Sequence, residues 1–166
     1  MRTAKTAQTY SDLPAEMREQ MCVLLNQQLA DAIDLYSQTK QAHWNVKGPQ
    51  FVSLHQLFDQ LAEAVEIDVD TIAERVTALG GVAQGTVRMA SAASRLPEFP
   101  QETVEGMLSV ELLADRYAAL AATMRNAIDS ATERHDASTA DLFTEMARAL
   151  DKSLWLLEAH VQEGRS

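Results

Sequence analysis

The sequence predicts an all-α protein, in which four long helices form two hairpins in one bundle. A long crossover carrying a short extra helix joins the hairpins. The chain has 166 residues, enough for one domain with a sizeable core. Hydrophobic residues make up 46% of it, only 5% is aromatic and there are six glycines, a composition that favours helices over a β-sandwich. Apolar residues recur at helical steps in four long segments between breakers.

The first helix is expected to begin after Asp12 and Pro14, because both residues are favourable near a helix start. It ends near Asn45, just before the breaker Gly48-Pro49. The stripe that it turns toward the core is Met21, Leu25, Leu29, Ala32 and Tyr36. In this interpretation residues 1–13 are a flexible N-terminal tail and residues 14–166 are the bundle domain.

The second helix is expected from about Phe51 to Leu79, where Gly80-Gly81 gives a strong C-terminal signal. Its apolar row is Leu54, Phe58, Leu61, Val65, Ile72 and Val76. The connection that follows, residues 81–100, contains proline and glycine, and Val87 to Arg95 is expected to form a short helix within it.

Glu102 and Glu105 open the third long helix, where carboxylates favour the positive end of the helix dipole. Its stripe is Val110, Leu113, Tyr117, Leu120, Met124 and Ile128. A polar turn at residues 133–136 precedes the last helix, whose stripe is Leu142, Met146, Leu150, Leu154, Leu157 and Val161. The lone cysteine, Cys22, permits no internal disulfide and is expected to be buried and inert.

The formal net charge is −10 and the isoelectric point is near 4.8. An acidic surface repels nucleic acid phosphates and attracts cations, which favours metal ions over DNA as partners. The N-terminus lacks the apolar run of a signal peptide, and no segment approaches the ~20 apolar residues of a membrane span. We therefore expect a cytoplasmic protein that does not contact a membrane. Association with the nucleoid is the alternative within that compartment.

The second helix also carries a polar row: His55, Asp59, Glu63, Glu66, Asp70 and Glu74. Steps of three or four residues keep these side chains on nearly one helix face. Such a row is usually a solvated face, but here the carboxylates repel one another and no lysine interrupts them. The row is also a palindrome about the point between Ala64 and Val65.

The palindrome predicts metal sites shared between two subunits. One ion cannot reach both ends of the row in one chain, because the two end pairs lie about 22 Å apart along the helix. A second copy packed antiparallel across a twofold axis brings His55 and Asp59 to the partner copy's acidic pair, since twofold interfaces are self-complementary. Oxygen ligands with imidazole suit iron, manganese or zinc, and transfer of two electrons to peroxide favours iron.

A second imidazole ligand is expected from His43, which the hairpin can place beside His55. Its neighbour Trp44 would shield the site. A histidine next to a tryptophan is more often packed or capping, and that interpretation stays open.

At this point the chain resembles the Dps family, the DNA-binding proteins from starved cells. The likeness lies in TKQAHWNVKGPQFVSLHQLFD at 39–59, DTIAER at 70–75, LGG at 79–81, LADRYA at 113–118, TAD at 139–141 and LDKSLW at 150–155. It implies a ferritin-like four-helix bundle that assembles from twofold dimers into a hollow dodecamer with di-iron ferroxidase sites. The residues implied as both metal ligands and catalytic residues are His43, His55 and Asp59 of one subunit, with Asp70 and Glu74 of its neighbour.

The implied function is oxidation of Fe(II), generally by hydrogen peroxide in preference to dioxygen, and storage of ferric mineral against oxidative damage. Zinc would compete for the same ligands. Glu63 and Glu66 are candidates for seeding mineral, with plain interface charges as an equal alternative. The candidates for an acidic iron-entry pore are Asp136, Asp141 and Glu145. A capping box at Ser138-x-x-Asp141 is the competing explanation for that cluster.

Weak or absent DNA binding is expected, because the first 13 residues contain only Arg2 and Lys5 as basic residues and offer few phosphate contacts. The competing function is a nucleoid-compacting DNA-binding protein in which the metal site is secondary. The weak tail and the intact ligand row favour the ferroxidase. An inert helical bundle would leave the symmetric acidic row unexplained.

Overall fold

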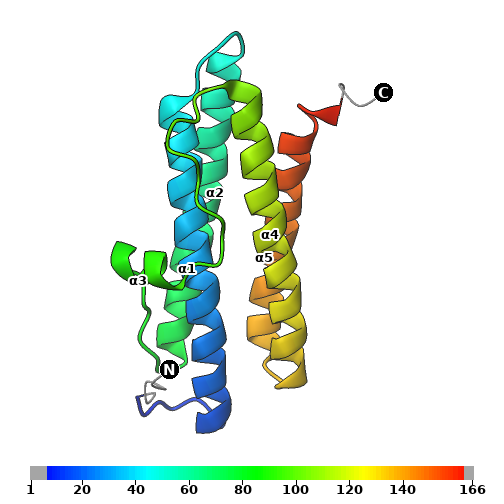
Figure 1. The fold of residues 1–166 in the computed structure, drawn as a ribbon. Helices are drawn as coiled ribbons and strands as arrows, with labels where there is room; N and C mark the ends of the chain where they lie inside the picture. The colour runs from blue at the N-terminus through cyan, green and yellow to red at the C-terminus, as the bar shows by residue number, and fades with distance from the viewer. Residues whose placement is uncertain (1–6, 163–166) are drawn as a thin grey trace.

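The computed structural model describes residues 7–162, and over that range the protein is all-helical (Figure 1). The five helices are α1 (Ala15–Asn45), α2 (Phe51–Ala78), α3 (Val87–Ala93), α4 (Gly106–Glu133) and α5 (Ala137–Glu158). Helices α1 and α2 form one antiparallel hairpin and α4 and α5 form the other, while the crossover runs along α1 from α3 to the start of α4 (Figure 1). The expected bundle and its short extra helix are confirmed. No helix among residues 7–162 is long and apolar enough to cross a membrane.

The core lies between the two hairpins and follows the predicted stripes. All six members of the apolar row of α2 are buried, as are the stripe residues of α1 apart from the half-buried Tyr36. Four stripe residues toward the C-terminus are only partly buried: Ile128, Leu142, Leu154 and Val161. Tyr117 is fully buried at the centre, where its hydroxyl contacts the Thr39 hydroxyl and donates to the Leu61 carbonyl.

The helix ends agree with the sequence in position and differ in their capping. Gly80 has a φ of 83°, the left-handed conformation that ends α2. Pro14 stands at the N-cap of α1, without help from the Asp12 side chain. The N-cap of α5 is Asp136, whose carboxylate accepts from the Thr139 amide at 3.0 Å. The competing explanation of a capping box at Ser138 is therefore wrong.

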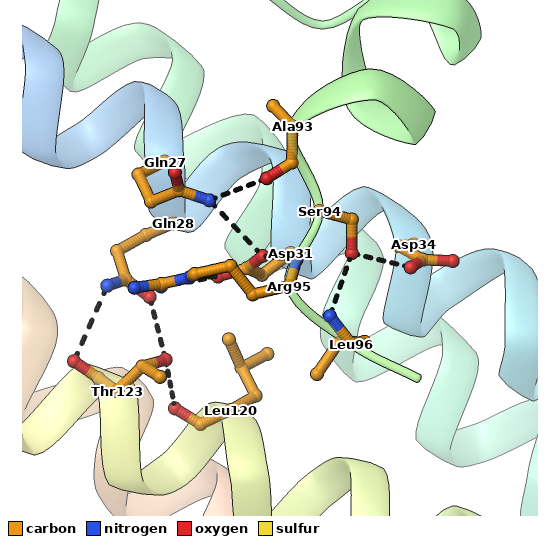
Figure 2. A network of polar contacts seen from close by, with 10 residues as sticks. All are labelled: Gln27, Gln28, Asp31, Asp34, Ala93, Ser94, Arg95, Leu96, Leu120 and Thr123. Atoms are coloured by element: carbon orange, nitrogen blue, oxygen red, sulfur yellow. Dashed lines mark hydrogen bonds and ion pairs between the residues drawn. The ribbon is translucent and has the colours of Figure 1, made fainter. Parts of the chain in front are cut away.

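A polar network around the buried Asp31 anchors the crossover to α1 (Figure 2). Asp31, 1% exposed, accepts hydrogen bonds from both the backbone amide and the guanidinium of Arg95. One turn later, Asp34 accepts from the Ser94 hydroxyl, and Gln27 donates to the Ala93 carbonyl at 2.9 Å. These contacts fix the path of the chain between α3 and α4.

Ala7 and Thr9 lie against the end of α2, although the sequence assigns residues 1–13 to a flexible tail; residues 1–6 of that tail lie outside the described range. The Ala7 amide donates to the Gly80 carbonyl at 2.7 Å. Arg18 is 8% exposed, and its guanidinium donates to the carbonyls of Leu13, Ala7 and Leu79. A side chain at Gly80 would meet the Ala7 carbonyl at 2.8 Å, so this approach requires glycine.

Candidate metal centre

Two histidines meet where the end of α1 faces the start of α2. The Nδ1 atom of His43 lies 2.8 Å from the His55 carbonyl, and the Nδ1 atom of His55 lies 2.9 Å from the His43 carbonyl. Their rings stack with centroids 3.8 Å apart and planes inclined by 20°. Because each Nδ1 donates to a backbone carbonyl, each Nε2 carries the lone pair that binds metal. The expected pairing of His43 with His55 is therefore present within one chain.

Asp59 lies one turn beyond His55 and brings a carboxylate near the two imidazoles. Its Oδ1 atom is 3.7 Å from the His43 Nε2 and 2.6 Å from the Lys40 ammonium. The hydrogen bond from Lys40 holds the pKa of Asp59 below its ordinary value, and the same bond raises the pKa of Lys40. The carboxylate is thus kept ionised and already accepts one cation. The sequence analysis assigned no role to Lys40, which reaches the site from α1 across the hairpin.

Aromatic side chains border the histidine pair without enclosing it. Phe51 lies 5.2 Å from the His55 ring between centroids, and the Lys40 ammonium lies 5.9 Å from the centroid of Trp44. Trp44 is 67% exposed and lies beside Lys40, whereas His43 is only 8% exposed.

The other predicted ligands, Asp70 and Glu74, lie on the same helix and do not reach this site within one chain. Asp59 and Asp70 are separated by about 16 Å along α2, from the helical rise. Asp70 and Glu74 are exposed, as are Glu63 and Glu66 between the two ends. Within the part of one chain that the structure describes, no three acidic, histidine or cysteine side chains are placed to hold an ion together.

The three pore candidates differ in accessibility. Asp136 is 2% exposed, and its carboxylate is engaged by the Arg75 guanidinium at 2.9 Å and by Thr139. Asp141 and Glu145 are exposed on α5. Asp136 therefore acts structurally in the subunit, whereas Asp141 and Glu145 are free to meet solvent.

A further carboxyl group, Asp68, was not anticipated from the sequence. It lies half-buried on α2 with Glu145 of α5 nearby. Burial raises the pKa of Asp68 to about 7, and the Glu145 charge adds to the shift. No sequence signal separates Asp68 from the acidic row beside it, because its distinction arises from packing against the second hairpin.

The hairpin thus brings two imidazoles and one carboxylate near one another, but one chain does not dispose all three around a common point. Imidazole and carboxylate suit borderline divalent metals, including iron and zinc. An ion held here would therefore need further donors from water or from another molecule.

The comparisons with known proteins agree with this architecture. Residues 22–166 match the family model described as a ferritin-like domain. The chain is 45% identical over 159 residues to the "DNA protection during starvation protein" of Agrobacterium fabrum, with 96% of this chain and 98% of that protein covered. It is 33% identical over 148 residues to "DNA protection during starvation protein 2" of Bacillus anthracis, covering 89% and 100% of the two chains.

Solved structures show the same fold. DpsC from Streptomyces coelicolor superposes with a TM-score of 0.92 at 29% identity, covering 97% of this chain and 94% of that one. An archaeal Dps homologue from Halobacterium salinarum gives a TM-score of 0.90 at 26% identity, with coverage of 98% and 91%.

Proposed function

Because this chain belongs to the ferritin-like proteins, in their Dps family, we propose that it is a ferroxidase and iron-storage mini-ferritin. Its di-iron sites form between subunits. His43, His55 and Asp59 of one subunit bind Fe(II) together with Asp70 and Glu74 of its twofold neighbour. Hydrogen peroxide is the oxidant, and the ferric product is stored inside a dodecameric shell.

The observation that carries this proposal is the reciprocal bonding of His43 and His55. Each ring is oriented by the backbone of the other, so both Nε2 atoms are ready for metal before any ion arrives. If His43 served only as a packed or capping residue, its environment would not require a second histidine whose ring bonds back to the His43 carbonyl. The exposed carboxylates at the far end of α2 supply the complementary half, as the palindromic row requires.

Iron is the substrate of this reaction, and the chain's own groups bind and orient it. Two Fe(II) ions each give one electron to one peroxide molecule, whose O–O bond breaks. Hydrolysis then yields two ferric oxyhydroxide units and releases four protons for every two Fe(II) ions oxidised. The carboxylates of Asp59, Asp70 and Glu74 offset the rising charge of the metal.

The remaining candidates take supporting roles in the proposal. Glu63 and Glu66, exposed between the two ends of the row, are candidates for seeding mineral. Asp141 and Glu145 are candidates for an entry pore, with Asp136 holding the start of α5 behind them. Zinc would compete with iron for the histidines.

DNA protection is proposed to follow from removal of iron and peroxide, with weak or absent DNA binding. A formal charge of −10 per subunit opposes contact with phosphate. Gel shift across a salt series distinguishes the two modes: tight retardation that resists salt would favour the nucleoid-compacting alternative.

Complementation between two inactive variants tests the shared site. His55→Ala removes the histidine half and Asp70→Ala removes the acidic half. Each variant alone is expected to oxidise Fe(II) at the background rate after anaerobic loading and peroxide addition. Shells from co-expressed variants should regain about a quarter of wild-type activity, because random pairing leaves one intact site in half of the dimers.

Glu111→Ala, which removes an exposed carboxylate on α4, is the matched control and should retain full activity. Full activity in Asp70→Ala alone would remove Asp70 from the site. Absence of recovery in mixed shells of confirmed composition would show that the sites do not combine these two halves.

A further inference from the structure

The first residue of α4, Gly106, packs against the hairpin that carries the two histidines. A β-carbon at Gly106 would lie 2.7 Å from the Leu54 Cδ1 atom, closer than such atoms approach in proteins. It would also lie 3.6 Å from the Lys47 carbonyl. Leu54 is fully buried and directly precedes His55, so it has little room to withdraw.

The start of α4 is itself held rigidly against this hairpin. The Lys47 amide donates to the Val104 carbonyl at 2.8 Å, and Lys47 forms an isolated parallel bridge with Glu105. The Glu105 carboxylate caps α4 by accepting from the Met107 and Leu108 amides. Because of these contacts, the beginning of α4 is held in place against the first turn of α2.

The histidine pair is sensitive to the placement of that turn. The His55 carbonyl orients the ring of His43, and the His43 carbonyl orients the ring of His55. A movement of α2 along α1 changes both distances together. Both rings then lose the orientation that directs their Nε2 atoms to metal.

We infer that Gly106 is a positioning residue for the metal site: the absence of its side chain lets α4 press on Leu54 and so fixes the turn that carries His55. This inference rests on the proposed function, because it concerns the same site. The three atoms nearest a β-carbon at Gly106 belong to Leu54, Lys47 and Val46, so its effect passes through Leu54. A larger side chain at residue 106 therefore requires a smaller one at residue 54.

The test uses the assembled protein and Co(II) alone under anaerobic conditions, with visible absorption reporting both affinity and ligand geometry. Gly106→Ala is expected to bind Co(II) about tenfold more weakly, as is typical when the groups that orient metal ligands are disturbed. Adding Leu54→Val should restore binding, because the exchange moves one carbon from residue 54 to residue 106 and conserves volume. Leu54→Val alone loosens the contact, retains assembly and should weaken binding a few-fold.

Two controls separate positioning from general destabilisation. Gly85→Ala meets only ordinary contacts, 3.7 Å and longer, and should bind as wild type does. Leu150→Ala opens a cavity in the core contributed by α5 and should lower stability without changing Co(II) affinity. Unchanged Co(II) binding and spectrum in both Gly106→Ala and Leu54→Val would overturn the inference, as would equal weakening in Leu150→Ala. If wild type and His55→Ala bind Co(II) equally poorly, the proposed function fails as well.

Discussion

His43 and His55 each use the other's backbone carbonyl to orient their own ring, at 2.8 and 2.9 Å. The two residues form one unit, because neither ring keeps its orientation when the other's backbone moves. A ligand pair of this kind is preorganised: the folding of the hairpin, and not the arriving metal, sets the direction of both Nε2 atoms.

The first prediction is that replacing either histidine lowers metal affinity nearly as much as replacing both. His43→Ala and His55→Ala each remove one ligand, one of the two ring-to-carbonyl hydrogen bonds across the hairpin and the ring on which the other histidine stacks. Each is expected to lower Fe(II) or Co(II) affinity about 10- to 100-fold, with the double variant little worse than either single variant. Anaerobic titration measures all three. His160→Ala, at an exposed histidine bonded to its own helix, is the control. Additive losses would show that the rings act independently.

The second prediction concerns Lys40, whose ammonium lies 2.6 Å from Asp59. Metal must share or displace this contact, so Lys40→Met is expected to bind Fe(II) a few-fold more tightly at neutral pH. The pKa of Asp59 should return toward its ordinary value in the variant, which moves the acid limit of metal binding to higher pH. Lys40→Arg should stay close to wild type. Weaker binding in Lys40→Met would instead assign Lys40 to holding Asp59 in place.

The third prediction follows from Asp68, whose pKa is raised to about 7 by burial and by Glu145. The unfolded chain releases this proton near pH 4, so between about pH 4 and 7 the folded state binds more protons. Stability therefore falls as pH rises through that window. Asp68→Asn should be more stable than wild type at pH 8, by about 1–2 kcal/mol after allowance for partial exposure, and not at pH 4.

Thermal melting at a fixed protein concentration, at both pH values, measures this difference. Glu145→Gln should reproduce part of the gain, because it removes the second contribution to the shift. Equal melting temperatures of Asp68→Asn and wild type at pH 8 would contradict the assignment.

The fourth prediction concerns the ion pair that holds the crossover. Asp31 is buried, whereas the side chain of Arg95 is 46% exposed. Arg95→Met leaves a buried carboxylate without its cation and should lower the free energy of unfolding by about 3–4 kcal/mol. Asp31→Asn leaves a guanidinium that water can solvate and should lower it by about 1–2 kcal/mol. Denaturant unfolding of both variants measures the two losses, and a larger loss in Asp31→Asn would contradict the prediction.

The sequence predicts the fold well where the signal is periodic and local. The apolar row of α2 and the Gly80-Gly81 end of that helix are confirmed, because helical spacing and a left-handed glycine act within a few residues of chain. The capping box considered as an alternative at Ser138 is wrong, because the N-cap of α5 is Asp136. Asp136 and Ser138 are both good capping residues, and the contact between Asp136 and Arg75 of α2 distinguishes them.

The candidate site is predictable in part for the same reason. The proximity of His43 and His55 follows from a hairpin, which a short turn forces. Their carbonyl partners carry no sequence signal, since every residue has a carbonyl. Lys40 was missed because its contact with Asp59 depends on the register between two helices. The partnership of Asp70 and Glu74 with a second chain stays a prediction, because it depends on an interface outside one subunit.

The short separation of the two histidines also bears on when the site can form. Only twelve positions divide them, so closing this loop costs little chain entropy and requires neither the crossover nor the second hairpin. During synthesis the pair can close as soon as the first hairpin emerges from the ribosome. At that stage the two histidines are already close, so zinc or iron that binds them would stabilise the hairpin while the rest of the bundle is still being made. The contact of Leu54 with α4, which fixes the final orientation of the pair, forms later.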